Sequence, residues 1–315
     1  MSYGKISPKE FIDKIITGGC VLCPQIGEDA SYIEVEGKYL VIHSDPITEA
    51  GKDAGFLSVV VACNDVNMKG VECKWVNTVL LLKHRSSLDE IIEGVNEACR
   101  ILKCKVVGGH TEVTMGLDKD IVITTAFSFS DKVMRLNEAR EGDYVGIMGT
   151  AGIEGTWILA NEYEDELLRR GVSKRVIESA KGYKYLIPVQ ERMLKVRDLA
   201  VAMHDATEGG VYQALLEISI ASGLKLKLTN DIPISEETME ITKALSISPY
   251  TLISSGAFLV VTRSPEEFEK RGGKIIGRLE KGEPCLEING KSYCNDFEEE
   301  LVRFESSYYG WRKGK

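Results

Sequence analysis

The interpretation of this chain depends on one stretch, Val106-Val107-Gly108-Gly109-His110-Thr111-Glu112. Its two valines predict the end of a short buried strand. The paired glycines predict a sharp turn at which the backbone approaches a ligand closely. An imidazole, a hydroxyl and a carboxylate follow at once, and such groups bind Mg²⁺ or polyphosphate, or transfer protons. The alternative is an ordinary turn with solvated polar residues, but aspartates elsewhere in the chain repeat the pattern.

Two of these aspartates flank a predicted hairpin. Residues 31–36 and 38–43 predict its strands, with Gly37 in the turn between them. Asp29 precedes the first strand, and Asp45 ends the second, where the following proline excludes the helical conformation. Strand register can bring the two carboxylates side by side, and adjacent carboxylates repel each other unless a cation or a proton lies between them. A divalent metal site is the economical explanation, although each aspartate alone is more often a turn or cap residue.

A third aspartate lies in a predicted core helix. Residues 55–68 are apolar on almost every side, which is typical of a buried helix. Asn64 and Asp65 place polar groups in that core, where a carboxylate is costly without a partner. A metal ion, a basic residue or a ligand must therefore compensate for Asp65.

The other elements of the first half predict an α+β fold. Residues 74–82 and 121–128 predict strands, and an amphipathic helix is predicted at 88–103. The resulting order β-β-α-β-α-β-β predicts a sandwich with helices on one face of the sheet. A charged connector follows, so we predict two domains, 1–137 and 138–315.

The second half contains a pattern similar to that of residues 106–112, in which polar residues and paired glycines follow a strand. Residues 199–203 predict a strand that runs into His204-Asp205-Ala206-Thr207-Glu208-Gly209-Gly210 and then into a helix. Backbone N–H groups at the start of such a helix favour an anion. The carboxylate of Glu208 is itself a candidate to occupy that position. A strand, glycine-rich turn and helix at 142–170 can also cradle phosphate, but the spacing matches neither the Walker A nor the dinucleotide fingerprint.

Composition and charge exclude several classes of protein. The 315 residues are 43% hydrophobic and 28% charged, as in soluble globular proteins. The net charge of −9 argues against non-specific nucleic-acid binding. No apolar run approaches the ~20 residues of a membrane span, and the N-terminus, where residues 8–17 predict a short amphipathic helix, lacks the apolar core of a signal peptide. We therefore predict a cytoplasmic protein whose eight cysteines, Cys20 and Cys23 included, are mostly thiols rather than a disulfide framework.

As a set, the motifs resemble those of the PurM/AIR-synthase superfamily. They stand in the family's order and spacing over nearly the whole chain. The superfamily includes aminoimidazole ribonucleotide synthetase, selenophosphate synthetase, thiamine-monophosphate kinase and the hydrogenase-maturation protein HypE. Residues 41–48 and 108–114 resemble the archaeal HypE-like branch in particular. The motifs that carry the resemblance are Gly27-Glu28-Asp29-Ala30, His43-Ser44-Asp45, Asn64-Asp65, Gly108-Gly109-His110-Thr111-Glu112 and His204-Asp205-Ala206-Thr207-Glu208-Gly209-Gly210.

The resemblance implies a PurM-like two-domain α+β fold. Its N-terminal mixed sheet would form a barrel with a second copy in a homodimer, and its C-terminal domain would be an α/β sandwich. It also implies ATP and Mg²⁺ as cofactors, with His110 and Glu112 as catalytic candidates. The expected Mg²⁺ ligands are Asp29, Asp45, Asp65 and Asp205. The expected nucleotide-binding residues are these four aspartates together with Gly27, Asn64, Gly108, Gly109, Thr111, Thr207, Gly209 and Gly210.

The activity implied by the resemblance is that of an ATP- and Mg²⁺-dependent enzyme. Such an enzyme activates an amide-type oxygen, as in a carbamoyl substrate, or phosphorylates a small acceptor, because carboxylate-bound Mg²⁺ neutralises charge on the transferring phosphoryl group. Three departures leave the substrate open. Cys20 and Cys23 lie too close to Gly27 to match the reactive cysteine region of selenophosphate synthetase. HypE carries a C-terminal cysteine where this chain has Trp311-Arg312-Lys313-Gly314-Lys315, and Glu208 stands where HypE relatives usually have a basic residue. The alternatives are a thiamine-monophosphate-kinase-like enzyme, a non-catalytic nucleotide-binding partner in a metallocentre maturation complex, and aspartates that serve only as caps and turns.

Overall fold

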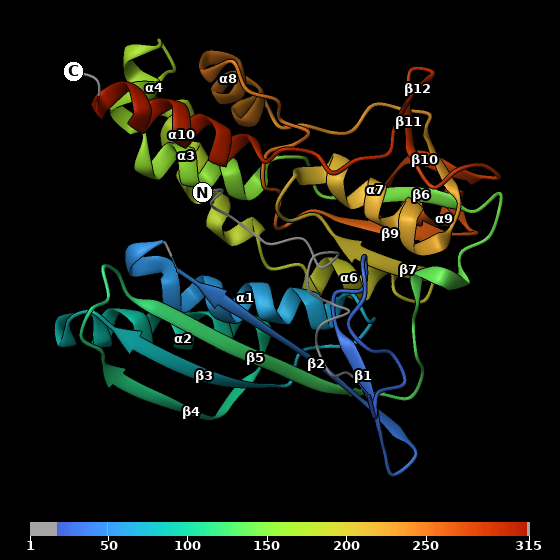
Figure 1. Ribbon diagram of the computed structural model, residues 1–315, viewed down its shortest axis with the longest axis horizontal. Coiled ribbons are helices and arrows are strands. Elements are labelled where there is room, and N and C mark those ends of the chain that lie inside the picture. The colour runs from blue at the N-terminus through green and yellow to red at the C-terminus, as the bar shows by residue number, and fades with distance from the viewer. Residues whose placement is uncertain (1–17, 49, 314–315) are drawn as a thin grey trace.

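The computed structural model describes residues 18–48 and 50–313 and contains two mixed sheets with associated helices (Figure 1). The first sheet has the strand order β1-β2-β5-β3-β4. The order of elements along the chain confirms the predicted β-β-α-β-α-β-β pattern. These elements are β1 (Ser31–Val35), β2 (Lys38–Ile47), α1 (Ala54–Asn67), β3 (Trp75–Leu82), α2 (Leu88–Leu102), β4 (Lys105–Val113) and β5 (Ile121–Ser130).

Helices α1 and α2 pack on one face of this sheet. α1 is buried along almost its whole length, because it lies between the sheet and the second half of the chain (Figure 1). Thr124 of β5 donates a 3.0 Å hydrogen bond to Ser58 of α1, which marks the helix-facing side of the sheet. Among the described elements, none packs on the opposite face. That outer face carries the half-exposed side chains of Leu40, Ile42, Trp75, Val79, Ile123, Phe127 and Phe129.

The second sheet has the order β12-β11-β8-β10-β6-β9-β7. One apolar core joins the two halves and includes Phe56 of α1 and Phe258 of the second sheet. Two sheets with helices confirm the predicted mixed α+β architecture, while the boundary between residues 137 and 138 stays a prediction. The elements are β6 (Tyr144–Met148), α3 (Ile153–Glu162), α4 (Glu164–Arg169), α5 (Lys174–Lys181), α6 (Gln190–Val196), β7 (Ala200–Asp205), α7 (Gly210–Ser222), β8 (Lys225–Leu228), α8 (Glu236–Leu245), β9 (Phe258–Thr262), α9 (Pro265–Lys270), β10 (Lys274–Glu280), β11 (Leu286–Ile288), β12 (Lys291–Tyr293) and α10 (Glu300–Lys313).

The turn predicted at Gly108 and Gly109 is wrong. β4 continues through both glycines to Val113 as an exposed edge strand, paired in parallel with β3. A register shift near Val107 brings the two backbones close together, and a Cβ atom on Gly109 would lie 1.9 Å from the carbonyl oxygen of Thr78. The glycines are therefore needed for the close approach of two strands rather than for a reversal of the chain.

The prediction that the cysteines are mostly thiols is also wrong. Sequence spacing does not show which cysteines meet in space, and the fold brings together Cys63 of α1 with Cys73, which precedes β3. Among the described residues only Cys99 and Cys104 are thiols. The disulfides are Cys20–Cys23, Cys63–Cys73 and Cys285–Cys294.

Two further predictions concern helices. The helix predicted to reach residue 170 ends at Glu162, because Tyr163 leaves the helical conformation and packs its ring against those of Phe304 and Tyr308 of α10. The helix predicted at residues 8–17 lies outside the described residues. Within the described part of the chain, every helix is too short or too polar to cross a membrane.

Candidate active site

A first carboxylate–histidine cluster forms where β2 meets α1. His43 and Asp45 share the helix-facing side of β2, because residues two apart on a strand point the same way. Asp65 lies in the last turn of α1. His43 Nε2 is 3.3 Å from Asp45 Oδ1 and 3.7 Å from Asp65 Oδ2. These three residues offer ligand atoms within 4.8 Å of one another.

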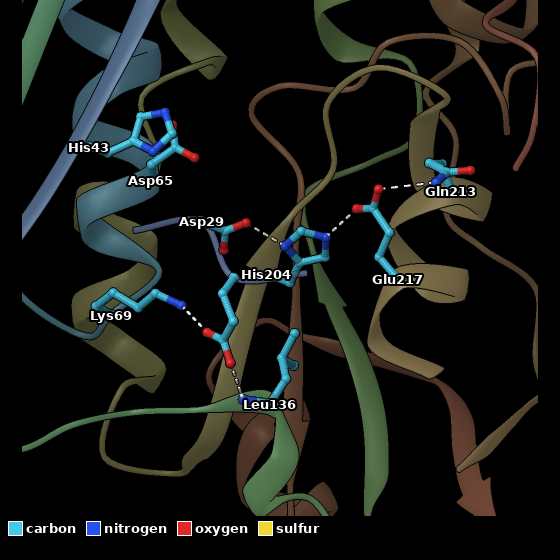
Figure 2. Close-up of polar contacts among 9 residues, drawn as sticks. Asp29, His43, Asp65, Lys69, Leu136, His204, Gln213 and Glu217 are labelled. Atoms are coloured by element: carbon cyan, nitrogen blue, oxygen red, sulfur yellow. Dashed lines mark hydrogen bonds and ion pairs between the residues drawn. The ribbon is translucent and has the colours of Figure 1, made fainter. Parts of the chain in front are cut away.

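A second cluster joins the two halves of the chain. Asp29 precedes β1, and His204 and Asp205 end β7; their ligand atoms also lie within 4.8 Å of one another. Figure 2 shows His204 between two carboxylates: Nδ1 lies 2.5 Å from Asp29 Oδ1, and Nε2 lies 2.7 Å from Glu217 Oε2 of α7. Burial lowers the pKa of His204, but the charges and hydrogen bonds of the two carboxylates outweigh burial and raise it well above its usual value. A charged imidazole therefore holds Asp29 to the second sheet.

The two clusters are close enough to interact through their charges. Burial lowers the pKa of His43, yet the hydrogen bond and charge of Asp45, followed by the charges of Asp29 and Asp205, raise it above its usual value. The charges of two carboxylates of the second cluster therefore act on a side chain of the first. The structure thus places Asp45 with Asp65 and Asp29 with Asp205, and their role as Mg²⁺ ligands stays a prediction.

The donor atoms of these clusters fit a hard divalent cation. Mg²⁺ is bound in proteins through carboxylate oxygens. Asp29 is buried, and its Oδ2 atom has no hydrogen-bond partner among the described residues. A buried carboxylate oxygen without a partner is costly, and a cation would satisfy it.

Glu154, which the sequence did not single out, extends this acidic region. It lies in the first turn of α3, is buried, and has an Oε2 atom with no hydrogen-bond partner among the described residues. Burial raises the pKa of Glu154 to about 7, and the charges of Glu208 and Asp45 contribute in the same direction. A carboxyl group that titrates near neutrality is suited to hold or release a proton.

We expect Glu154→Gln to change how stability depends on pH. Because the pKa of Glu154 is raised in the folded chain, the wild type loses stability as pH rises from the unfolded value near 4.5 to about 7. Glutamine removes this loss. We therefore expect the free energy of unfolding of the variant, measured relative to that of the wild type, to rise by on the order of 2 kcal/mol from pH 5 to pH 8. Urea denaturation at the two pH values measures the difference. Parallel pH dependences for the two proteins would contradict the assignment.

The start of α7 already has an anion. Gly209 and Gly210 both adopt positive φ values, 78° and 64°, as a glycine-rich helix start requires. Glu299 accepts hydrogen bonds from the backbone N–H groups of Gly209, Ile253 and Leu301. Burial raises the pKa of Glu299 to about 7 despite these bonds. The sequence suggested Glu208 for this position, and the fold supplies Glu299 from the segment before α10.

Three other predicted nucleotide-binding residues make contacts within the chain. Asn64 accepts a hydrogen bond from Val189 N and donates one to Ile187 O, so it docks the second half onto α1. The carbonyl of Thr207 accepts from Gly210 N and Ser254 N. Gly27 lies against α7, where a Cβ would approach Leu136, Ala221 and Glu217 to about 3 Å.

Residues 106–112, which belong to β4, lie apart from the two clusters within one chain. β4 is three strands away from β2, and His110 and Glu112 point to the outer face, where their side chains are 62% and 49% exposed. His110 Nε2 lies 3.1 Å from Glu112 Oε2, and this contact lowers the pKa of the Glu112 carboxyl. The predicted residues Gly108, Gly109, His110 and Thr111 border a groove of about 390 Å³ between β4 and α2.

A buried ion pair below the clusters was also missed. Lys69, which Figure 2 labels, is buried next to the end of α1 and forms an ion pair with Glu28. Glu28 Oε1 also accepts a 2.8 Å hydrogen bond from Leu136 N. The position of Lys69 directly after an apolar helix could have indicated a buried lysine. His43 and His204 could have been found as well, since each lies within two residues of a predicted aspartate ligand.

The chain is similar in sequence to known proteins. A putative hydrogenase expression/formation protein of Methanocaldococcus jannaschii is 27% identical over 274 residues, which cover 83% of this chain and 74% of that protein. The thiamine-monophosphate kinase of Archaeoglobus fulgidus is 23% identical over 301 residues, with coverage of 91% and 94%.

Solved structures share the fold. The Aquifex aeolicus enzyme ThiL complexed with AMPPCP and TMP superposes with a TM-score of 0.73 at 21% identity, over 86% of this chain and 90% of that one. The hydrogenase maturation protein HypE in complex with ATP gives a TM-score of 0.67 at 20% identity, over 87% of this chain and 90% of that one.

Two families match most of the sequence: AIR synthase related protein, N-terminal domain, at residues 27–128, and AIR synthase related protein, C-terminal domain, at residues 140–284. The chain therefore belongs to the AIR synthase related proteins and has the two-domain PurM-like fold of that superfamily.

Proposed function

We propose that this protein is an ATP- and Mg²⁺-dependent enzyme that activates an amide-type oxygen or phosphorylates a small acceptor. The observation that carries the proposal is the pair of carboxylate–histidine clusters, His43/Asp45/Asp65 and Asp29/His204/Asp205. Four aspartates from distant parts of the sequence meet in these two clusters, and carboxylates repel phosphates unless a cation lies between them. The relatives with bound AMPPCP or ATP support nucleotide as the ligand.

The roles of the residues follow from their contacts. Asp29, Asp45, Asp65 and Asp205 would hold Mg²⁺, which when bound neutralises negative charge on the phosphates of ATP. His204 orients Asp29 by fixing one of its oxygens and leaves the other available to a ligand. Glu154 can hold a proton close to the charges of Asp45 and Glu208 near neutral pH.

The acceptor has two candidate classes. The likeness to a putative hydrogenase expression/formation protein favours a HypE-like reaction on a carbamoyl-type substrate, together with a maturation-protein partner. The likeness to thiamine-monophosphate kinases favours phosphorylation of a small molecule. Incubation with ATP and either carbamoylated peptides, small amides or thiamine monophosphate separates the two classes by the product formed.

Calorimetric titration with ATP tests the proposal directly. We expect binding in the presence of Mg²⁺ and an affinity at least about tenfold lower after chelation, because without the cation four carboxylates face the triphosphate. Titration with Mg²⁺ alone measures the cation site separately. An absence of ATP binding in the presence of Mg²⁺ would contradict the proposal, and ATP binding without turnover would favour the alternative, a non-catalytic nucleotide-binding partner in a maturation complex.

A homodimer is part of the proposal. The outer face of the first sheet exposes a row of apolar side chains, including Trp75, Phe127 and Phe129, whose rings pack against one another. Exposed apolar faces of this kind mark interaction surfaces, and a second copy would cover this one. Pairing through that face would also bury His110 and Glu112. Light scattering that gave the mass of a single chain would contradict the dimer.

A further inference from the structure

Cys99 and Cys104 lie at the junction of α2 and β4. Cys99 occupies the last turn of α2, Lys103 reverses the chain direction with a φ of 57°, and Cys104 directly precedes β4. The reversal brings the two sulfur atoms to 3.3 Å, with the Cys104 thiol donating to Cys99 Sγ. All of the other six cysteines are joined in disulfides. This pair is therefore the one place where the described chain holds two thiols in contact.

The two thiols are not equivalent. Cys99 is partly exposed, whereas Cys104 is 2% exposed. The hydrogen bond from Cys104 lowers the pKa of Cys99, with a smaller contribution from Lys105, and the same bond together with burial raises the pKa of Cys104. An accessible thiol that ionises more readily is the attacking group in thiol–disulfide exchange, and a protected neighbour resolves the mixed disulfide.

We propose that Cys99 and Cys104 form a reversible dithiol–disulfide site that is oxidised by low-molecular-weight disulfides. The Cys99 thiolate attacks one sulfur of the small disulfide, forms a mixed disulfide and releases one thiolate. Cys104 gives its proton to that thiolate, and its own sulfur then attacks Cys99 Sγ and releases the second small thiolate, which takes up from solvent the proton that Cys99 lost when it ionised. The protein loses two electrons and two protons, and the small disulfide becomes two thiols.

The same two elements, α2 and β4, also border a groove. Val95 and Asn96 of α2 form one wall of the groove, and Val106 and Gly108 of β4 form the other. Gln190 of α6 donates a 2.8 Å hydrogen bond to Leu102 O, which ties the segment between the two cysteines to the second domain. Oxidation therefore cross-links the end of α2 to the beginning of the edge strand at a point that both domains contact.

Treatment of the folded protein with oxidised glutathione tests the proposal. The wild type should lose two free thiols per chain and retain no glutathione, as measured by thiol titration and intact mass, with peptide mapping to Cys99–Cys104. Cys104→Ser should retain one glutathione on Cys99, because no resolving thiol remains. Cys99→Ser should react at least about tenfold more slowly, since the remaining thiol is buried.

Three results would overturn the proposal. The first is wild-type protein whose two thiols persist under conditions that modify Cys104→Ser. The second is wild-type protein that accumulates a stable glutathione adduct on Cys99. The third is equal reaction rates for the two single variants, which would remove the distinction between attacking and resolving thiols. If a serine variant folds poorly, wild-type protein that keeps both thiols in excess oxidised glutathione also overturns the proposal, because Cys99 is partly exposed.

Discussion

Asp205→Asn is expected to weaken Mg²⁺-dependent ATP binding, and any ATP turnover, by about a hundredfold or more. Asparagine keeps the shape of the side chain but removes the negative charge that would face the cation. Asp205 belongs to the cluster with Asp29 and His204, and its charge reaches His43 in the other cluster. One substitution should therefore reduce the negative charge that acts on both clusters. Titration calorimetry with ATP and Mg²⁺, and phosphate release from ATP, measure the loss, and Asp45→Asn should behave in the same way.

The matched control is Asp131→Asn. Asp131 is a carboxylate with a 90% exposed side chain, paired at 3.8 Å with Lys38, and its replacement should leave ATP binding within about twofold of wild type because exposed charges are screened by water and salt. If Asp205→Asn and Asp131→Asn bind ATP equally well, the aspartates act only as caps and turns, and the metal site does not exist.

Lys69→Met is expected to lower the free energy of unfolding by about 3–5 kcal/mol. The side chains of Lys69 and Glu28 are 1% and 3% exposed, so the variant leaves a buried carboxylate without its cationic partner. The Glu28 carboxylate also accepts a hydrogen bond from the backbone N–H of Leu136. This neutral donor does not replace the charge of the lost ammonium group. Chemical denaturation at pH 7 measures the change.

Two further variants show whether burial is the cause. Arg100→Met removes an ion pair with Glu93 in which both side chains are more than 60% exposed, and it should cost less than about 1 kcal/mol. The double variant Glu28→Gln/Lys69→Met removes both charges and should recover part of the stability lost in the single variant. A loss for Lys69→Met no larger than that for Arg100→Met would refute a stabilising role for the buried pair.

The candidate site could be predicted in part because its acidic residues end regular elements. Asp45 and Asp205 follow apolar strands, and Asp65 interrupts an apolar helix, so each is visible as an acidic residue where burial is expected. Glu154 and Glu299 carried no such signal. Glu154 follows a glycine-rich turn, and Glu299 lies in a run of acidic residues that is typical of solvated surface, yet burial raises both pKa values to about 7.

The opening stretch shows the opposite case. Gly108-Gly109 was interpreted as a turn, because paired glycines usually permit one, but the sheet uses them to admit a neighbouring strand at close range. Their position on an edge strand separates His110 and Glu112 from the clusters within one chain. Local composition does not distinguish a reversal from a close approach, since both exploit the missing Cβ.

By itself, the sequence determined the order of the elements, the α+β class and four of the acidic residues that meet, because hydrophobic periodicity and the residues that end each element are local properties. Only the tertiary structure decided which carboxylates share a histidine, which cysteines pair and which anion occupies the start of α7. Those outcomes depend on distances between segments up to 175 positions apart, as between Asp29 and His204. Packing of the whole chain sets such distances, and no short stretch of sequence contains them.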